Sequence, residues 1–529
     1  MIIKRLLIEP LIFFLIEDAM ATKKKVEILE RDKVIRELIG SDESLEEHIS
    51  QAKHTSQAEA LIYMLAGYNV FLSGPAGSGK SWVIQKFQDL YNLFYPNKRL
   101  AITSTTGTSA NRINGKTIHS WSGLGISTSS YEDDIKKPPA HWYHTDNIIR
   151  FTSCLIIDEV SMLSDKQFEY VLKRIRSLRE HGTQIIVSGD FTQLPPVEGN
   201  YCYGTEEWNK CNFLHLYLDK NYRAKDDKEF ADVLQEISIG NGYNSEIFDK
   251  IKNIKTLEND GKAIMRLFST NKAADKVNSE MHRLNKGKLV KNATTYGKKT
   301  SHDKANSEDL NFAKRCNVDK ELALKAGDTV MVTSNQNNSE LIYSRNEDEA
   351  LPLRNGSIGK FFIDKDGRWA IQLSNGDEYA FKKPVHIALT SRKWRKAKEQ
   401  DSKEDIIDGK ILEEKELASF NQYPLKLAYA ITMHKSQGQT FSDVAIDLSR
   451  CWCENLGYVA LSRAQTLNGL RLVSKDGVKV NNLALAVSEA SIEIKKQIME
   501  ESIKVRKLEF KEALKKFNKH LDEEIEIGD

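Results

Sequence analysis

Residues 74–81, GPAGSGKS, have the types and spacing that bind a nucleoside triphosphate. The pattern follows an apolar run that predicts a strand, and it opens a stretch that predicts a helix. Glycines let backbone N–H groups curl around phosphate oxygens, and the helix N-terminus adds a favourable dipole. We expect Lys80 to contact the β- and γ-phosphates of ATP and Ser81 to bind Mg²⁺. The expected ATP contacts are Gly74, Pro75, Ala76, Gly77, Ser78, Gly79, Lys80 and Ser81.

Two further stretches place polar groups directly after predicted strands. Asp158 and Glu159 follow the apolar run CLII, and Gln193 lies in SGDFTQLPP at 188–196. Asp158 is expected to join the Mg²⁺ shell and Glu159 to orient an attacking water, although an Asp-Glu pair after a strand is often a helix cap. Gln193 can touch both the γ-phosphate and that water. The alternative for this stretch, a proline-terminated turn, does not account for Gln193.

Short apolar runs alternate with helical stretches around these groups. NVFLSG, RLAITST, SCLIIDE and QIIVSGD predict buried parallel strands, and SWVIQKFQDLYNLF and DKQFEYVLKRIRSLREH predict the helices between them. The carboxyl ends of such strands meet at one edge of a sheet, where ligands bind. The fold class is therefore α/β. This pattern spans 51–215, and a second α/β set, beginning with LHLYLDKNYR, spans 216–286 and 416–480.

The rest of the chain differs in character. Short strands with glycine turns at 287–415 predict a small β-barrel inserted in the second α/β unit. Residues 1–50 are predicted to form an N-terminal extension and 481–529 a charged helical extension. The apolar stretch in the first 20 residues is interrupted by Glu9 and Pro10, and it is too short to span a bilayer. We therefore expect a cytoplasmic protein with no membrane partner.

The amino-acid composition limits the class of protein but does not indicate a function. The 529 residues hold 77 Lys and Arg against 75 Asp and Glu, a net charge of +2, which neither indicates nor excludes nucleic-acid binding. The six cysteines form no CxxC pair, so zinc is not expected and the thiols are predicted to be idle in a reducing compartment.

The ordered motifs resemble those of superfamily-one DNA helicases, and most of all the RecD/Dda/Pif branch. They are the phosphate loop, IIDEVSM, GDFTQLPPV, LDKNYRA, AITMHKSQGQTF and YVALSRA, and they cover roughly residues 50–475. The resemblance implies two RecA-like domains with ATP between them and an SH3-like barrel in the second. It also implies roles for Gln57 in reading adenine and for Gln437 and Gly438 in lining the cleft. Arg223 and Arg463 would reach the γ-phosphate across the cleft, whereas the commoner fate of an arginine is a surface ion pair.

The same resemblance implies DNA-contacting loops on both domains. The expected contacts are Thr105, His119, Trp121, Thr432, His434, Lys435 and Ser436. Considered alone, hydroxyl clusters usually mark turns and a tryptophan is more often part of a core. A stretch at about 121–149 interrupts the first domain, and one of its aromatics, Trp142, Tyr143 or Tyr131, is a candidate wedge at a duplex junction. The alternative is a loop anchored by one aromatic.

We therefore expect an ATP-dependent DNA helicase that needs Mg²⁺, moves 5′→3′ on single-stranded DNA and acts at single-strand/duplex junctions. Replication or repair proteins are possible partners, and a monomer is expected without DNA. A motor subunit beside a nuclease and an ATP-gated clamp with little unwinding remain alternatives. Two departures weaken assignment to one subfamily. A PFGG element is replaced by SLREHGTQ, and Asn455-Leu456-Gly457 stands where a Gly-Gln usually precedes YVALSR.

Overall fold

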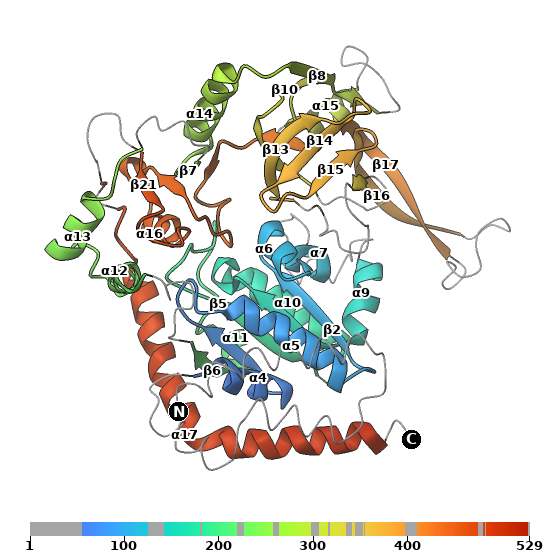
Figure 1. The fold of residues 1–529 in the computed structure, drawn as a ribbon. Coiled ribbons are helices and arrows are strands. Elements are labelled where there is room, and N and C mark those ends of the chain that lie inside the picture. The colour runs from blue at the N-terminus through green and yellow to red at the C-terminus, as the bar shows by residue number, and fades with distance from the viewer. Residues whose placement is uncertain are drawn as a thin grey trace.

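The computed structural model has two parallel sheets, an inserted antiparallel segment and a long C-terminal helix (Figure 1). We call residues 55–218 the first lobe, 227–284 with 428–487 the second lobe, and 289–427 the inserted segment. The structure describes residues 55–526 except 125–141, 180–181, 219–226, 258–263, 298–305, 316–317, 335–340, 344–352, 354, 397–409, 474–479 and 482.

The first lobe is built on a six-stranded parallel sheet in the order β3-β2-β4-β5-β1-β6. Its strands are β1 (Val70–Ser73), β2 (Arg99–Ser104), β3 (Lys116–Thr117), β4 (Thr152–Asp158), β5 (Gln184–Gly189) and β6 (Leu214–Tyr217). The four predicted strands, β1, β2, β4 and β5, are confirmed. The predicted domain boundary at 215 is wrong, because β6 pairs with β1 from Leu214 onward and so completes the first sheet.

Helices cover both faces of this sheet, and the loops between strands and helices lie at its edge. They are α4 (Gln57–Leu65), α5 (Lys80–Phe94), α6 (Gly107–Arg112), α7 (Ile118–Ser122), α9 (Trp142–Phe151), α10 (Asp165–Leu178) and α11 (Glu206–Lys210), with a 3₁₀ turn at Val160–Met162. The Ser164 hydroxyl accepts from the Gln167 N–H while the Gln167 side chain accepts from the Ser164 N–H, a capping box that fixes the start of α10. The apolar faces of α5 and α10 then pack on opposite sides of the sheet.

The second lobe has a four-stranded parallel sheet in the order β19-β7-β20-β21. Its elements are α12 (Lys228–Ser238), α13 (Ser245–Lys252), β7 (Met265–Phe268), α14 (Asn271–Leu284), β19 (Ala430–Thr432), β20 (Val444–Ile446), a 3₁₀ turn at Leu448–Arg450, α16 (Leu456–Leu461) and β21 (Leu470–Leu472). Leu194 of the first lobe packs into the core of this lobe. The two lobes therefore share apolar contact beside the loop that carries Gln193.

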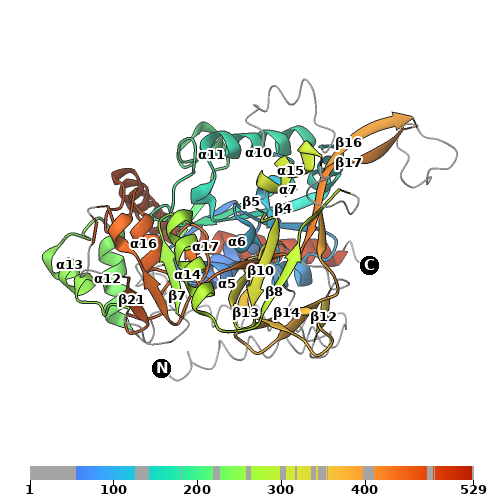
Figure 2. The same cartoon turned by 90° about the horizontal axis from the view of Figure 1, so that it is seen from above.

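The inserted segment is antiparallel, and a long hairpin projects from it away from the lobes (Figures 1 and 2). A six-stranded sheet has the order β12-β15-β14-β13-β11-β18. The elements are β8 (Leu289–Ala293), β9 (Thr295–Tyr296), α15 (Ser307–Arg315), β10 (Glu321–Lys325), β11 (Thr329–Val332), β12 (Leu341–Tyr343), β13 (Ile358–Ile363), β14 (Trp369–Leu373), β15 (Glu378–Phe381), β16 (Val385–Lys396), β17 (Lys410–Gln422) and β18 (Leu425–Leu427). The predicted boundary at 415 is wrong, because β17 continues past it and β18 pairs with β11.

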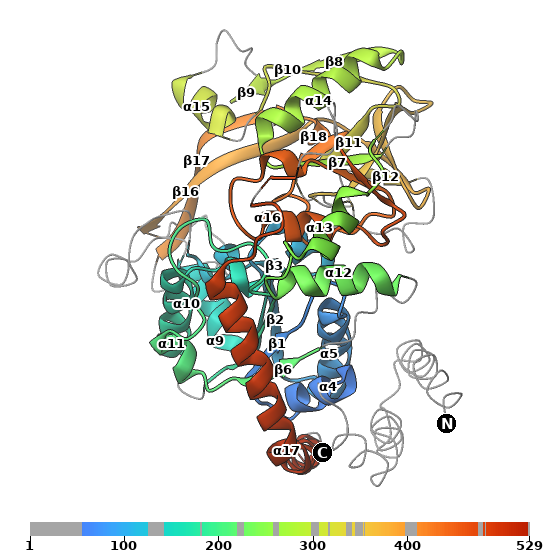
Figure 3. The ribbon, with the colours of Figure 1, turned by 90° about the vertical axis from the view of Figure 1, so that its left-hand side faces the viewer.

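The C-terminal helix α17 (Glu489–Glu526) runs along the first lobe (Figure 3) and confirms the predicted helical extension. Ile498 and Phe517 are buried in two cores of that lobe. The Ser502 hydroxyl accepts from the backbone N–H of Tyr217 at 3.0 Å, so the helix is joined to the edge strand β6. Among the described residues, no helix combines the length and apolarity needed to cross a membrane.

Candidate active site

The phosphate loop joins β1 to α5 in a conformation that only glycine permits at two positions. Gly79, the N-cap of α5, has φ 87°. A Cβ on Gly74 would lie 2.4 Å from the carbonyl oxygen of Leu218. The Lys80 ammonium folds back over the loop and donates to the carbonyls of Gly74 at 2.6 Å and Pro75 at 3.0 Å. Burial lowers the pKa of Lys80, although Asp190, Glu159 and Asp158 act in the opposite direction.

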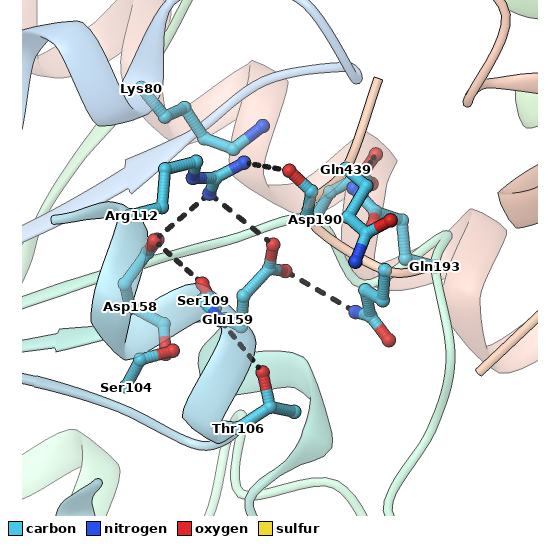
Figure 4. A network of polar contacts seen from close by, with 12 residues as sticks. Lys80, Ser104, Thr106, Ser109, Arg112, Asp158, Glu159, Asp190, Gln193 and Gln439 are labelled. Carbon is cyan, nitrogen blue, oxygen red and sulfur yellow. Dashed lines mark hydrogen bonds and ion pairs between the residues drawn. The ribbon is translucent and has the colours of Figure 1, made fainter. Parts of the chain in front are cut away.

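Asp158 ends β4, and Glu159 turns into the space beside the phosphate loop (Figure 4). Glu159 has φ 55°, a left-handed backbone that costs a residue with a side chain about 1–2 kcal/mol. Both carboxylates are buried, with relative exposures of 2% and 6%. Burial, and then the Asp158 charge, raise the pKa of Glu159, while Arg112, Lys80 and Arg463 act to lower it. A buried carboxylate held this way is suited to orient water and accept a proton.

Arg463 reaches this space from the second lobe. Its guanidinium Nη2 donates to the Gln193 side-chain oxygen at 3.4 Å and to the Ser462 hydroxyl at 2.7 Å. Its Nε donates to the Val459 carbonyl at 2.8 Å. Burial lowers the pKa of Arg463 to about 10, so the guanidinium stays charged at neutral pH. The side chain that the motif order placed across the cleft therefore lies in it, within reach of the first-lobe loop.

The loop after β19 adds two more contacts across the boundary. Gln437 Nε2 donates to Glu159 Oε2 at 3.3 Å, and the Gly438 carbonyl accepts from Arg112 Nη1 at 2.7 Å. These loops enclose a cavity of about 280 Å³. Its lining residues are Ala76, Gly77, Gly79, Lys80, Ser81, Trp82, Arg112, Asp158, Glu159, Gln193, Gly438, Thr440 and Arg463.

The donor set of this cavity fits a triphosphate with its magnesium ion. Ser81 and Asp158 both line it, and they offer the hard oxygen ligands that Mg²⁺ takes. No three His, Cys, Asp or Glu side chains cluster into a metal cage anywhere in the described part of the chain. The buried hydroxyl of Ser78 has no partner among the described residues.

Gln57 does not line the cavity. Gln57, at the start of α4, donates from Nε2 to the Ser78 carbonyl at 3.3 Å, so it touches the back of the phosphate loop. Arg223 lies outside the described residues.

The expected DNA contacts divide into surface and core positions. Lys435 is exposed, and Thr105 donates its hydroxyl to the Glu159 carbonyl at 3.1 Å. His119 is half-buried, 3.4 Å from the Gln167 side chain, and burial lowers its pKa. His434 is half-buried, and burial lowers its pKa as well.

Three of the predicted DNA side chains are buried, so the predictions for them are corrected. Trp121 is 4% exposed and packs in the first-lobe core, because its helix α7 turns the indole inward. Thr432 and Ser436 are also buried, and the Ser436 hydroxyl donates to the Met433 carbonyl at 2.7 Å. Their hydroxyls form hydrogen bonds within the turn that follows β19, so they do not face a DNA strand.

The wedge candidates have a similar outcome. Trp142 is 7% exposed, and the Arg174 guanidinium lies 3.8 Å from its ring centroid, so this indole anchors α9 to α10. The prediction that Trp142 is a wedge is therefore wrong, and its packing agrees with the anchoring alternative. Tyr131 lies outside the described residues, as does the side chain of Tyr143.

Four residues for which the sequence predicted no contact join the site or its rim. Arg112 pairs with the Asp158 carboxylate at 3.4 Å. Asn455, with φ 68°, donates to the Gln193 carbonyl at 2.8 Å, and the Tyr458 hydroxyl donates to Asp190 Oδ2 at 3.3 Å. Trp452 is 57% exposed, and its ring stacks on His434 at 5.6 Å with an interplanar angle of 8°. Trp452 is the one the sequence could have signalled, as a tryptophan between cysteines before YVALSR.

Known proteins share this fold and these motifs. A family model described as PIF1-like helicase matches residues 48–247. The ATP-dependent DNA helicase Pif1 of Psychrobacter sp. (strain PRwf-1) is 30% identical over 497 residues, which cover 84% of this chain and 74% of that protein. The chain spans only 59–62% of the length of the helicases of this name from Danio rerio, Xenopus laevis and Emericella nidulans.

Solved structures also match the fold, including the following two. The crystal structure of Pif1 helicase from Candida albicans has a TM-score of 0.68 at 26% identity, covering 84% of this chain and 98% of that one. Pif1 from Bacteroides has a TM-score of 0.62 at 22% identity, covering 84% and 96%, a likeness of fold alone. With five of the six motifs lining one cavity in the described residues, and a relative of this identity and coverage, the chain belongs to the PIF1-like helicase family.

Proposed function

We propose that the chain is an ATP-dependent DNA helicase that hydrolyses ATP between its two lobes and moves 5′→3′ along single-stranded DNA. One observation carries this proposal. Lys80 and Glu159 of the first lobe and Arg463 of the second line the same cavity. A site divided in this way is complete only when the lobes are together, so nucleotide binding and hydrolysis change the distance between them. Family membership supports the activity, and the 5′→3′ direction rests on the family resemblance.

Each cavity residue then has a chemical role. Lys80 exchanges its two carbonyl partners for β- and γ-phosphate oxygens, which are stronger acceptors. Glu159 orients the attacking water and takes its proton. Arg463 neutralises charge that develops on the γ-phosphate, and an arginine in this role contributes about 10³–10⁵ in rate.

Ser81 and Asp158 would hold Mg²⁺, which when bound neutralises the β- and γ-phosphate oxygens. Gln193 is the residue through which hydrolysis is sensed. Its side chain contacts Arg463 at 3.4 Å and its backbone carbonyl contacts Asn455 at 2.8 Å. A change at the γ-phosphate thus alters two contacts between the lobes.

Single-stranded DNA is proposed to cross the loops that follow β2 and β19. The Bacteroides structure was solved with single-stranded DNA bound. Lys435 supplies an exposed cation and Thr105 lies on the opposing first-lobe loop. Trp452, held by a hydrogen bond from its Nε1 to the Ser269 carbonyl at 3.2 Å, is 57% exposed and stacks on His434, the residue before Lys435. A base can stack there, which contributes about 1–3 kcal/mol.

The remaining assignments are also proposals. The antiparallel sheet of the inserted segment is an SH3-like barrel that lies over the DNA path. Gln57 positions the phosphate loop on the side where adenine binds, and Arg223 is a second cation for the γ-phosphate. Replication or repair proteins are the proposed partners of a protein that is monomeric without DNA.

The test compares unwinding of duplexes with a 5′ or a 3′ single-stranded tail, in the wild type and in Lys80→Ala. We expect displacement only from the 5′ tail, and none in the variant. ATPase stimulation by single-stranded DNA without displacement from either tail would identify a clamp and overturn the helicase proposal. Displacement from the 3′ tail alone would overturn the direction.

A further inference from the structure

Arg112, the last residue of α6, lies where three parts of the active site meet (Figure 4). Its Nη2 is 3.4 Å from Asp158 Oδ2 and 3.8 Å from Glu159 Oε1. Its Nη1 donates to the Gly438 carbonyl of the second lobe at 2.7 Å. One guanidinium therefore contacts both catalytic-site carboxylates and the facing lobe.

The carboxylate pair needs a cation in this conformation. The side chains of Asp158 and Glu159 are only 3% and 8% exposed, and two adjacent buried negative charges repel each other strongly. Lys80 does not supply that charge by direct contact, because its ammonium donates to the carbonyls of Gly74 and Pro75. Arg112 does, at 3.4 Å from a carboxylate that would also hold a metal ion.

The contact with the second lobe is equally specific. Gly438 has φ 80°, and a Cβ there would lie 3.6 Å from Arg112 Nη1, so the guanidinium packs closely on this turn. Gly438 ends the loop that begins with Thr432 and carries Lys435, the exposed cation proposed to face DNA. A change in the position of Arg112 therefore acts directly on the DNA-facing loop.

The other end of α6 touches the remaining parts of the proposed DNA path. The Thr106 hydroxyl accepts from the Ser109 N–H at 3.2 Å and fixes the first turn, directly after Thr105. A Cβ on Gly356 of the inserted segment would lie 3.1 Å from Thr108 Cγ2. Figure 1 shows α6 directly below that segment. Helix α6 thus links the ATP cavity, the second lobe and the inserted segment.

We propose that Arg112 is a positioning residue that competes with Mg²⁺ for Asp158 and transmits the outcome to the second lobe through Gly438. Before nucleotide binds, its guanidinium neutralises the two carboxylates and holds the lobes together. Asp158 and Ser81 would hold Mg²⁺, and an ion bound there would take Asp158 from Arg112 and so change the hydrogen bond from Arg112 to the Gly438 carbonyl. Its Nε, which has no partner among the described residues, is a spare donor for a phosphate oxygen. This inference rests on the proposed function.

The experiment uses the full chain with Arg112→Gln, Arg112→Lys and the matched control Arg150→Gln, an exposed arginine at the end of α9. The first measurement is the Mg²⁺ concentration that half-saturates binding of a fluorescent ADP. We expect Arg112→Gln to lower it about five-fold, since a competing cation worth roughly 1 kcal/mol is removed. Arg112→Lys is expected to restore the wild-type value because it keeps the charge.

The second measurement is the ratio of single-stranded DNA affinities with and without a non-hydrolysable ATP analogue. We expect this ratio to move toward one in Arg112→Gln and also in Arg112→Lys, because an ammonium lacks the separate, rigidly placed donors with which the guanidinium contacts Asp158 and the Gly438 carbonyl. Both measurements should match the wild type in Arg150→Gln.

Wild-type values of both quantities in Arg112→Gln would overturn the inference. So would an equal loss of thermal stability and of both effects in Arg112→Lys and Arg112→Gln, which would indicate a merely structural role. Failure of the proposed function gives a different result, namely a wild-type ATPase that single-stranded DNA does not stimulate.

Discussion

The guanidinium of Arg463 lies 3.4 Å from the side-chain oxygen of Gln193, and this contact joins the second lobe to the loop that follows β5 of the first. The same loop accepts a hydrogen bond from Asn455 at its Gln193 carbonyl. Asn455 precedes α16 and Arg463 follows it, so both ends of this helix are hydrogen-bonded to one first-lobe loop. A shift of that loop is therefore expected to move the helix. The side chain proposed to neutralise charge at the γ-phosphate therefore also contacts the loop that joins the two lobes.

Replacement of Arg463 tests that relationship. We expect Arg463→Ala to lower the rate of ATP hydrolysis in the presence of DNA by about 10³-fold or more, with little change in nucleotide affinity. Arg463→Lys should recover only part of the rate, because an ammonium lacks the planar fork that contacts Gln193 and phosphate together. Steady-state hydrolysis with fluorescent-nucleotide binding separates the two effects. A rate within three-fold of the wild type in Arg463→Ala would contradict the role.

The pH dependence of hydrolysis should show the raised pKa of Glu159. Glu159 must be deprotonated to accept a proton, so activity is lost as pH falls through its pKa. Because burial and Asp158 raise that pKa, the acid limb is expected at higher pH than for an ordinary carboxyl group. Arg112 acts to lower the pKa, so Arg112→Gln should move the limb further up. Profiles of kcat/KM against pH, measured at fixed free Mg²⁺, check the order of the two limbs.

Much of the first lobe and its loops could be predicted from the sequence because the relevant signals are local. The phosphate loop needs glycines and a lysine within eight residues, and strands β1, β2, β4 and β5 are short buried runs bounded by polar residues. The errors concern long-range partners. Edge strand β6 looked like the start of a new unit because its pairing with β1 joins residues more than 140 positions apart.

The missed site residues have the same explanation. Arg112 lies seven positions after Thr105, an expected DNA contact, and only the fold brings it to Gly438, 326 positions away. The prediction for Trp121 was wrong because the sequence alone does not distinguish an aromatic side chain that faces DNA from one that packs in a core. Whether the indole faces in or out depends on how α7 packs against α9 and β2.

The buried Lys495 of α17 is expected to make the free energy of unfolding depend on pH. It is 5% exposed, donates to the Ser238 hydroxyl at 2.5 Å, and burial lowers its pKa from 10.5 to about 8. The unfolded chain therefore binds more protons between pH 8 and 10.5, so this group makes stability rise with pH across that window. Lys495→Met should remove that rise and increase the free energy of unfolding at pH 7 by about 1–3 kcal/mol.

Denaturant unfolding of both proteins at pH 7 and pH 9.5 measures this difference. The Ser238 hydroxyl keeps its hydrogen bond to the Gln235 carbonyl at 2.7 Å in the variant, so no buried donor is orphaned. An exposed lysine on the same helix, Lys496, provides the control as Lys496→Met. Equal changes with pH in the wild type and in Lys495→Met would contradict the prediction.

Trp452 is expected to act as a base-stacking platform for single-stranded DNA. One ring face is covered by His434, and the Nε1 hydrogen bond to Ser269 fixes the ring plane, so the other face is presented without further ordering. Trp452→Ala should weaken binding of single-stranded DNA about ten-fold, within the range of one stacked base. An oligonucleotide with a single abasic site should bind the wild type more weakly at one register, and the variant should not distinguish it from the intact strand. Fluorescence anisotropy gives both affinities.

Phe151→Ala, which removes another exposed aromatic at 59% exposure on the first lobe, is the control and should leave both affinities unchanged. If Trp452→Ala still discriminates against the abasic strand, the bases stack elsewhere and the exposed indole has no part in DNA binding.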